Sequence, residues 1–345
     1  MRRLLAIGPL VLAVLLPGSG IARESGIKVP RGFKVDVWAR GLSHPTAMAW
    51  GPDGRLYVTE VDGAIAAIGP SRRPEPFVRD LTVPLGLAWS DRLLFVSQSG
   101  KVERMQLRGS RVIDRRVIAA RLPYGLHQQN NILVGRNGRL FLGSGSTCDA
   151  CRDGDRRSAA VLTMRFDGSD LRVFSRGLRN PYGLAFQPGT NRLYVSVNGR
   201  DKLGSRADPE PAEMVVVARR GRWYGWPSCW PNARLLRMSG SCRGVTRPAA
   251  YLEPHSSADG MAFYTGTRFP RGYRGNLFVA EWGQYDAHRF GRRVVRIQLG
   301  PRGGARRVST FADGFDHPLA VENDLHGGLL VADWGRGVIY RIRHG

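Results

Sequence analysis

Lysine is scarce in this 345-residue chain: Lys28, Lys34, Lys101 and Lys202 are the only lysines among 52 basic residues, and the other 48 are arginines. Acidic residues are also few, 28 in number, so the formal net charge is +24. Long hydrophobic runs are missing after residue 22, which excludes a membrane-spanning helix from the rest of the chain. Global disorder is excluded as well, because 42% of the residues are hydrophobic and 23% are charged, close to the globular average.

Cysteine is rare too, and its four residues fall as Cys148-x-x-Cys151 and as Cys229 with Cys242. A zinc ribbon needs two close pairs, whereas the second pair is separated by twelve residues and has no histidine at ligand spacing. A thioredoxin-like motif needs a strand-to-helix junction, whereas loop-forming residues flank this CxxC. We therefore predict two structural disulfides, Cys148–Cys151 and Cys229–Cys242.

The N-terminus has the pattern of a secretory signal peptide. Two arginines precede an apolar run from Leu4 to Leu16, and Gly20-Ile21-Ala22 offers a small-x-small cleavage site. The run of about 13 residues is shorter than the roughly 20 that span a bilayer, and an uncleaved N-terminal anchor is the alternative. We predict that residues 1–22 are removed and that residues 23–345 form a single periplasmic or secreted domain, a destination that fits the disulfides.

One phrase recurs along the rest of the chain. Residues 45–60 combine a short apolar strand, a Pro-Asp-Gly turn and a second, alternating strand, and related phrases begin near residues 85, 131, 182, 260 and 318. With 44 glycines and 21 prolines, which oppose long helices, six such copies predict an all-β fold, a six-bladed β-propeller of four-stranded antiparallel blades. A β-sandwich is the alternative, but it does not explain a sixfold repeat. The later copies are further apart, and we expect their insertions to build the functional site.

Four motifs carry a family resemblance. They are Tyr-Gly-Leu-His-Gln-Gln-Asn-Asn at 124–131, Gly-Leu-Arg-Asn-Pro-Tyr-Gly-Leu-Ala-Phe at 177–186, Asn-Gly-Arg-Asp at 198–201 and Trp-Tyr-Gly-Trp-Pro at 223–227. With these four motifs in this order, the chain resembles the soluble pyrroloquinoline quinone (PQQ)-dependent sugar dehydrogenases, in particular the glucose/sorbosone dehydrogenase family. The resemblance implies a periplasmic enzyme that oxidises an aldose or sorbosone, with PQQ and Ca²⁺ as cofactors and an external electron acceptor. The tryptophan-rich motif is assigned to packing between blades.

The resemblance also implies individual roles around the quinone. His127 is the expected catalytic base, which removes the proton of a sugar hydroxyl as hydride moves to the quinone, a task that imidazole performs near neutral pH. Arg179 and Asn180 match the pair that contacts the quinone, where a guanidinium can stack on the ring and donate to its oxygens. Gln128, next to the base, is assigned to the cofactor as well.

The segment 198–200, which the same resemblance singles out, is expected to hold the metal. The backbone carbonyls of Gly199 and Arg200 would bind calcium, which takes hard oxygen ligands. Asn198 would face the cofactor, and Glu213 would support the segment from behind. In the last blade, His317 stands where the family has an arginine, and we assign it to the cofactor.

The chain differs from the glucose-oxidising members of this family in its positively charged residues. No lysine follows residue 202, although the family uses a fifth-blade lysine to neutralise the three carboxylates of the cofactor. Arg289, Arg292 or Arg293 would substitute for it. His255 and the loop 281–286 are expected to face the channel, where tryptophan and carboxylate side chains suit sugar stacking and hydroxyl binding.

Two other functions are compatible with the sequence. A non-catalytic propeller that binds a polyanion or a protein would use the positive charge, which is +22 without the signal peptide and also predicts contact with an anionic envelope surface. A calcium-dependent sugar lactonase would need channel carboxylates and asparagines, for which Glu60, Asn180, Asn198 and Asp201 are the candidates. Nucleic acid is not an expected partner, because the chain has no recognition helix and no RNA-stacking motif.

Overall fold

The computed structural model describes residues 26–201, 211–284 and 289–345. The predicted signal peptide, residues 1–22, therefore lies outside the described residues. Regular structure in the described ranges is almost entirely β, with one 3₁₀ turn at Arg271–Tyr273. None of the described helical structure has the length and apolar character that a membrane crossing requires.

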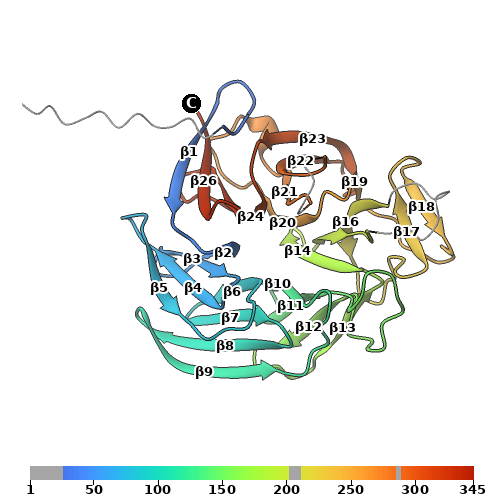
Figure 1. The fold of residues 1–345 in the computed structure, drawn as a ribbon, viewed down its shortest axis with the longest axis horizontal. Coiled ribbons are helices and arrows are strands. Elements are labelled where there is room, and N and C mark those ends of the chain that lie inside the picture. The colour runs from blue at the N-terminus through green and yellow to red at the C-terminus, as the bar shows by residue number, and fades with distance from the viewer. Residues whose placement is uncertain (1–25, 202–210, 285–288) are drawn as a thin grey trace, which may run out of the picture.

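Six four-stranded antiparallel sheets stand in a ring, so the predicted six-bladed propeller is confirmed (Figure 1). The first strand of each blade lies innermost and contacts the first strands of both neighbouring blades. The blades, each given from its innermost strand outward, are β2 (Pro45–Trp50), β3 (Leu56–Glu60), β4 (Ala64–Ile68) and β5 (Pro74–Val78); β6 (Gly86–Ser90), β7 (Leu93–Gln98), β8 (Lys101–Arg108) and β9 (Arg111–Ala119); β10 (Gln129–Val134), β11 (Arg139–Ser144), β12 (Ala160–Arg165) and β13 (Arg172–Arg176); β14 (Asn180–Phe186), β15 (Leu193–Asn198), β16 (Ala212–Ala218) and β19 (Ala250–Pro254); β20 (Ala258–Phe263), β21 (Leu277–Glu281), β22 (Arg293–Leu299) and β23 (Ala305–Asp313); and β24 (Pro318–Asn323), β25 (Leu329–Asp333), β26 (Val338–His344) and β1 (Phe33–Arg40).

The sixth blade closes the ring, because its outermost strand comes from the N-terminal end of the described chain. Strand β1 pairs with β26 from Phe33 opposite His344 to Arg40 opposite Val338. An ion pair between Arg341 and Asp36, 2.6 Å apart, joins the same two strands. Closure in this way pairs both ends of the described chain with each other and gives the sixth blade its fourth strand.

The middle strands of the blades read as apolar runs because both of their faces are buried. In β3, Leu56, Tyr57 and Val58 are fully buried, since neighbouring blades cover each side. The inner strands approach one another so closely that some positions accept only glycine. A Cβ atom on Gly183 would lie 2.3 Å from the carbonyl oxygen of Asp259 in the next blade.

Two of the insertions in the repeat each contain a disulfide. A hairpin of β17 (Cys229–Asn232) and β18 (Arg237–Gly240) lies between β16 and β19, and the Cys229–Cys242 bond closes it. The loop between β11 and β12 contains the Cys148–Cys151 bond. Both predicted disulfides are confirmed, and the loop between β11 and β12 reaches the end of the channel where the motif residues gather.

Candidate active site

The motif residues meet at one end of the central channel, where the inner strands begin and the second strands end. In the fourth blade this places Asn180, the first residue of β14, directly opposite Asn198, the last residue of β15. The end of β11 and the loop before β10 bring His127 and Gly145 to the same level, and the N–H of Gly145 donates to the backbone carbonyl of Gln128. The sequence motifs thus converge through strand register rather than through proximity in the chain.

These residues surround a cavity of about 810 Å³. Its lining mixes cationic, amide, carboxylate and aromatic groups, and consists of Leu126, His127, Arg179, Asn180, Asn198, Gly199, Asp201, Glu213, His255, Ser257, Trp282, Gly283, Gln284, Arg289 and Phe290. The predicted positions His127, Arg179, Asn180, Asn198 and Gly199 are therefore brought together. His255 and Glu213, which the sequence placed near the channel, join them.

The ring of His127 is oriented by a backbone carbonyl. Its Nδ1 lies 2.9 Å from the carbonyl oxygen of Ser146, which can only accept a hydrogen bond, so the Nδ1 position carries the proton. Burial, with the positive charge of Arg179, lowers the pKa of His127 to about 4. The imidazole is therefore neutral at physiological pH, and its Nε2 atom has a free lone pair. A Cβ atom on Gly145 would lie 2.4 Å from the Cβ of His127, so this packing requires glycine.

The Arg179 side chain is only 5% exposed and donates to four acceptor atoms, the most distant of which is the Asp201 carboxylate at 3.5 Å. Its Nε donates to the carbonyl oxygen of Asp149 at 3.0 Å, and its Nη2 donates to the Asp149 carboxylate at 2.7 Å. Its Nη1 donates to the carbonyl oxygen of Gly199. The guanidinium carbon also lies 5.8 Å from the ring centre of Trp226. This network fixes the guanidinium at the cavity wall, next to the segment predicted to bind calcium.

The disulfide loop links the arginine to the histidine. Asp149, inside the Cys148–Cys151 bridge, holds Arg179 as described above. Asp153, two residues after the bridge, accepts hydrogen bonds from the backbone N–H of Thr147 at 2.7 Å and from the Ser146 hydroxyl at 2.9 Å. Ser146 in turn binds the His127 ring. One loop therefore orients both residues.

Asn180 and Asn198 offer different side-chain atoms to a ligand. Asn130 donates to the Oδ1 of Asn180 at 2.7 Å, which leaves the Nδ2 of Asn180 as a donor. Asn198 instead uses its Nδ2, which donates to Ser257 at 2.8 Å and to Asp259 at 3.0 Å. The Oδ1 of Asn198 is buried and has no hydrogen-bond partner among the described residues. An acceptor of this kind at a cavity wall marks a place for a donor or a cation.

The predicted calcium segment is only partly directed at the cavity. Gly199 lines it, and its N–H donates to the carboxylate of Glu213. Burial raises the pKa of Glu213 to about 8. The guanidinium carbon of Arg200, in contrast, lies 4.1 Å from the ring centre of Trp230, and Arg200 is not among the lining residues.

Two positions assigned to the cofactor are not among the residues that line the cavity. His317 packs on Trp282 with ring centres 3.9 Å apart, and its Nδ1 lies 3.1 Å from Asp316. Trp282 and Gln284 line the cavity, whereas His317 does not. Gln128 is also absent from the lining, and its backbone carbonyl accepts the N–H of Gly145 at 2.9 Å.

Among the three fifth-blade arginines, Arg289 is the one that lines the cavity. Arg292 pairs with Asp316 at 2.8 Å. Arg293 lies 2.6 Å from the fully buried Glu281, so this carboxylate is engaged in an ion pair rather than facing a sugar. Residues 285 and 286, which belong to the loop 281–286 predicted to face the channel, lie outside the described residues.

Some functional residues were missed at the level of sequence. Asp149 and Asp153 lie within and just after the CxxC, and the acidic residues around that motif were the available signal. Leu126 and Phe290 add apolar surface to the cavity. Their contribution depends on loop conformation, which the repeat pattern does not encode.

The residue set for a lactonase is not assembled. Glu60 accepts a hydrogen bond from the N–H of Ser43 at 2.5 Å and does not line the cavity that contains the other three candidates. In the described part of the chain, the one cluster of potential metal-binding side chains is Cys148, Cys151 and Asp153, in which both cysteines form a disulfide.

The fold and the site together indicate an enzyme built on a six-bladed propeller. Its channel end holds a neutral histidine, a buried arginine and two asparagines. The chain belongs to the Glucose / Sorbosone dehydrogenase family, whose model matches residues 95–330. It is accordingly an oxidoreductase of the sugar dehydrogenase type.

Curated proteins and solved structures are also similar to this chain. A protein of Borreliella burgdorferi is 24% identical over 92% of this chain and 91% of its own length, and the aldose sugar dehydrogenase YliI of Escherichia coli is 24% identical over 49% of this chain and 50% of its own. The PQQ-bound aldose sugar dehydrogenase of Streptomyces coelicolor has a TM-score of 0.70 and 22% identity, covering 92% of this chain and 99% of that one. A family AA12 enzyme of Trichoderma reesei has a TM-score of 0.81 and 16% identity, covering 95% and 100%. The structural likenesses show a shared fold.

Proposed function

We propose that this protein is a PQQ- and calcium-dependent dehydrogenase that oxidises an aldose or sorbosone outside the cytoplasm. The observation that carries this proposal is His127. Its protonated Nδ1 is fixed by the Ser146 carbonyl, and it shares one cavity with Arg179 and Asn180, the two positions that match the quinone-contacting pair. The family membership supplies the reaction class, and these three residues supply the chemistry for it.

The cavity suits a planar, anionic cofactor. Its volume of about 810 Å³ falls within the range of roughly 300 to 1,000 Å³ that is typical of ligand sites. Arg179 and Arg289 would pair with carboxylates of PQQ, and the Nδ2 of Asn180 would donate to its oxygens. Because burial raises the pKa of Glu213 to about 8, this carboxyl is mostly uncharged near pH 7 and does not repel an anion.

Calcium would use oxygen atoms beside the cofactor. The Gly199 carbonyl and the Oδ1 of Asn198, which has no partner among the described residues, are neutral oxygens of the kind that calcium accepts, and Asp201 lies at the same wall. The Gly199 oxygen also accepts from Arg179, but a carbonyl oxygen has two lone pairs. The remaining ligands would come from the cofactor and from water.

His127 would act as the general base. A sugar hydroxyl that donates to its Nε2 loses its proton there as the C–H bond breaks, and Nδ1–H remains bonded to Ser146, which stabilises the imidazolium that forms. PQQ, when bound, supplies the electrophilic quinone carbon that accepts the hydride. Trp282 and Phe290 at the wall offer apolar surface to the sugar ring.

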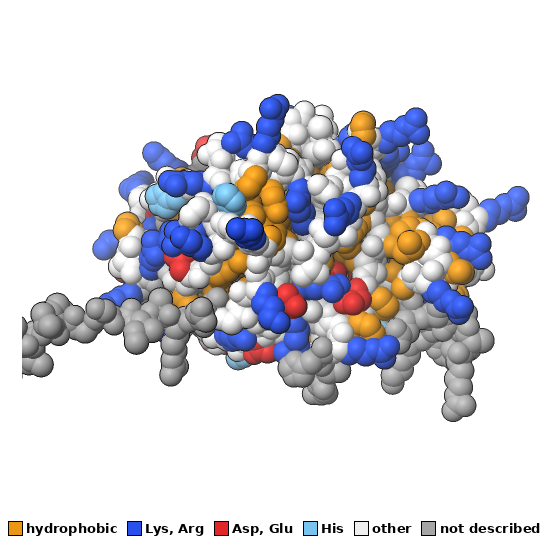
Figure 2. Space-filling model, turned by 90° about the horizontal axis from the view of Figure 1, so that it is seen from above, with side chains coloured by type: hydrophobic (Ala, Val, Ile, Leu, Met, Phe, Trp, Pro, Cys, Tyr) orange, Lys and Arg blue, Asp and Glu red, His pale blue; other side chains and the backbone are white. Residues whose placement is uncertain are grey.

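The export signal, an external electron acceptor and contact with an anionic envelope surface belong to the same proposal. Two disulfides support an oxidising compartment. The charge, +22 without the signal peptide, supports an anionic surface or partner, and Figure 2 shows arginines and lysines spread over the visible face. N-terminal sequencing of the exported protein tests the export signal. A start at Arg23 is expected, and a start at Met1 would contradict the predicted cleavage.

Reconstitution tests the enzyme activity. The purified protein is mixed with PQQ and CaCl₂, free cofactor is removed, and reduction of an artificial acceptor is followed with aldoses and sorbosone. His127→Ala should bind PQQ as the wild type does but lose about 10²- to 10⁴-fold in kcat, the usual contribution of a general base. Arg179→Ala should instead weaken PQQ binding, because it removes a charge-assisted contact.

His326→Ala is the matched control, because His326 is exposed on a turn of the sixth blade. This variant should keep both PQQ binding and turnover. Failure of the wild type to retain PQQ in the presence of calcium would contradict the cofactor assignment. Retention of PQQ without reduction of any acceptor by these sugars would contradict the reaction.

A further inference from the structure

A buried carboxyl group of the fifth blade contacts the segment of the fourth blade that is predicted to bind calcium. Asp259, the second residue of β20, is 1% exposed and is not among the residues that line the candidate active site. Its Oδ1 atom accepts a hydrogen bond from the Nδ2 of Asn198 at 3.0 Å, and its Oδ2 atom accepts one from the hydroxyl group of Ser257 at 3.1 Å. Asn198 and Ser257 both line the cavity, so Asp259 contacts two residues of its wall.

Contacts of its own backbone hold Asp259 in place. The hydroxyl group of Ser196 in the fourth blade donates to the backbone carbonyl of Asp259 at 2.6 Å and accepts from the N–H of Gly183 at 2.8 Å. The same carbonyl oxygen lies so close to Gly183 that a Cβ atom there would be 2.3 Å away. These contacts join two blades and do not involve Asn198. The carboxyl group of Asp259 is therefore a fixed partner for the asparagine side chain.

This partner determines which end of the Asn198 amide faces the cavity. A carboxyl group offers an acceptor oxygen whether it is ionised or protonated, and Nδ2 is the only donor atom in the side chain of asparagine. Nδ2 is therefore directed at Asp259, and Oδ1 is left buried with no hydrogen-bond partner among the described residues. Without Asp259, only the Ser257 hydroxyl would contact the amide. A hydroxyl group both donates and accepts, so it does not distinguish the two ends.

Asn180 provides an internal comparison, because it has the opposite orientation. It stands opposite Asn198 in the pairing of β14 with β15, and its Oδ1 accepts a hydrogen bond from the Nδ2 of Asn130 at 2.7 Å. Asn130 belongs to the third blade, just as Asp259 belongs to the fifth. In both cases a residue of a neighbouring blade orients the asparagine. A donor orients Asn180 and an acceptor orients Asn198, so the cavity receives a donor from one side chain and an acceptor from the other.

We propose that Asp259 is a positioning residue for the metal: by accepting a hydrogen bond from the Nδ2 of Asn198, it directs the Oδ1 of that asparagine at calcium. This inference rests on the proposed function, in which calcium lies beside Asn198 and Gly199. Asp259 is not itself a ligand and acts through Asn198. Partners of this kind orient the ligands of metal sites, and their loss typically costs about 10- to 100-fold in metal affinity.

The calcium requirement of PQQ binding tests the proposal without any measurement of turnover. The full chain is dialysed to equilibrium against PQQ over a series of CaCl₂ concentrations, and the bound cofactor is measured by its absorbance. Asp259→Ala should need about 10- to 100-fold more calcium than the wild type for half-maximal PQQ binding. Asp259→Asn keeps an acceptor oxygen and should need less calcium than Asp259→Ala. Asp259→Leu fills the space without an acceptor and should behave like Asp259→Ala, which keeps the test valid if the alanine variant folds poorly.

A double variant separates positioning from a general effect on the blades. Asn198→Ala/Asp259→Ala should need no more calcium than Asn198→Ala alone, because Asp259 acts only through the amide that is already missing. A merely structural role of Asp259 would instead add its full effect to that of Asn198→Ala.

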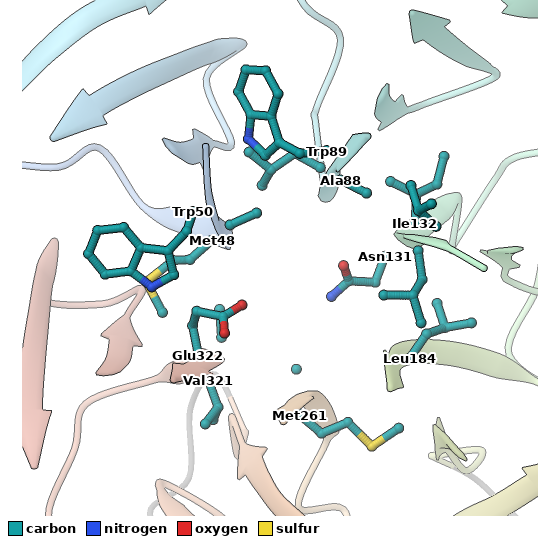
Figure 3. Close-up of a pocket in the computed structure, with 16 residues that line it drawn as sticks. Met48, Trp50, Ala88, Trp89, Asn131, Ile132, Leu184, Met261, Val321 and Glu322 are labelled. Carbon is teal, nitrogen blue, oxygen red and sulfur yellow. The ribbon is translucent and has the colours of Figure 1, made fainter. Parts of the chain in front are cut away.

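Glu322→Ala is the matched control. The carboxyl group of Glu322 faces the central channel in Figure 3, at a second cavity that shares no lining residue with the candidate active site. This variant should have the calcium requirement of the wild type. An unchanged requirement in Asp259→Ala, or an equal effect of this substitution with and without Asn198, would overturn the inference and leave the cofactor assignment intact. A wild type that binds PQQ at no calcium concentration would contradict the proposed function itself, and the inference with it.

Discussion

At the scale of single residues, the proposed function depends on His127, which is neutral because it is buried beside Arg179. Desolvation and the nearby guanidinium of Arg179 disfavour the imidazolium, while the Ser146 carbonyl fixes the proton on Nδ1. In the proposed mechanism the same arginine has two effects, since it would bind the anionic cofactor and it lowers the pKa of the proposed base. The carboxylates of Asp149 and Asp153 act in the opposite direction on that pKa.

The pH profile of the reconstituted enzyme should reflect this environment. Because the pKa of His127 is lowered to about 4, kcat/KM should stay high as the pH falls through 6.5 and decline only toward pH 4. Arg179→Gln should move the acidic limb to higher pH, since a positive charge next to the imidazole is removed. A wild-type limb centred near pH 6.5 would contradict the assigned environment.

His127, Arg179 and Asn180 could be predicted from sequence because each sits in a motif whose order along the blades is fixed. His317 and Glu281 could not be placed in the same way. Their motif positions put them at the channel end, but Asp316 and Trp282 engage the histidine and Arg293 engages the glutamate. Such competition between partners depends on side-chain packing across blades, which a single sequence does not display.

At the scale of elements, the loop between β11 and β12 positions the site. Its Cys148–Cys151 bridge encloses Asp149, which binds Arg179, and Asp153 follows closely and binds the turn that holds His127. From sequence the bridge could be predicted only as a structural disulfide. Its functional contacts depend on the loop folding back across the channel end, which cysteine spacing does not reveal.

Removal of this bridge should therefore affect the cofactor more than the fold. In the Cys148→Ser/Cys151→Ser double variant, we expect PQQ to bind several-fold more weakly, because Asp149 no longer holds the guanidinium in place. Equilibrium titration of PQQ in the presence of calcium measures this, with the melting temperature as a check on folding. The corresponding Cys229→Ser/Cys242→Ser variant changes a hairpin outside the cavity lining and serves as the control. Equal PQQ affinity in all three proteins would show that the loop does not position Arg179.

At the scale of the whole molecule, six similar blades form a ring that the N-terminal strand closes. The repeat predicted the number of blades, because each copy supplies an inner and a second strand with the same alternation. The origin of the closing strand could not be read from the repeat, since β1 precedes the first copy and pairs with the last. Ring closure thus makes the sixth blade depend on β1 for its fourth strand.

Trp38 on the closing strand tests this dependence. It is 6% exposed, belongs to the core between the sixth and first blades, and lies 5.9 Å from Trp50 between ring centres. Trp38→Ala should lower the free energy of unfolding by about 3 to 5 kcal/mol, the usual cost of a large buried cavity. Val117→Ala, at a 51% exposed position on the outer strand β9, should change it by about 0.5 kcal/mol or less. Denaturant unfolding curves compare the two variants.

Buried carboxyl groups make the stability of the whole molecule depend on pH. The pKa values of Glu213 and Asp259 are raised by burial, each to about 8. The folded state therefore holds protons that the unfolded state releases at lower pH, so stability should be lost as the pH rises from about 4.5 to about 8. Glu213→Gln should reduce this slope, and the exposed control Glu75→Gln should not. Melting temperatures of the cofactor-free protein that rise over this interval would contradict the raised pKa values.

The central claim is that His127 abstracts the proton of a sugar held beside PQQ. Anaerobic single-turnover mixing tests it most directly: the protein loaded with PQQ and Ca²⁺ is mixed with an excess of sugar, without an acceptor, and the absorbance of the bound cofactor is followed. We expect one equivalent of reduction in the wild type and a rate about 10²- to 10⁴-fold slower in a His127→Ala variant that retains PQQ. Equal reduction rates in the two proteins would contradict it.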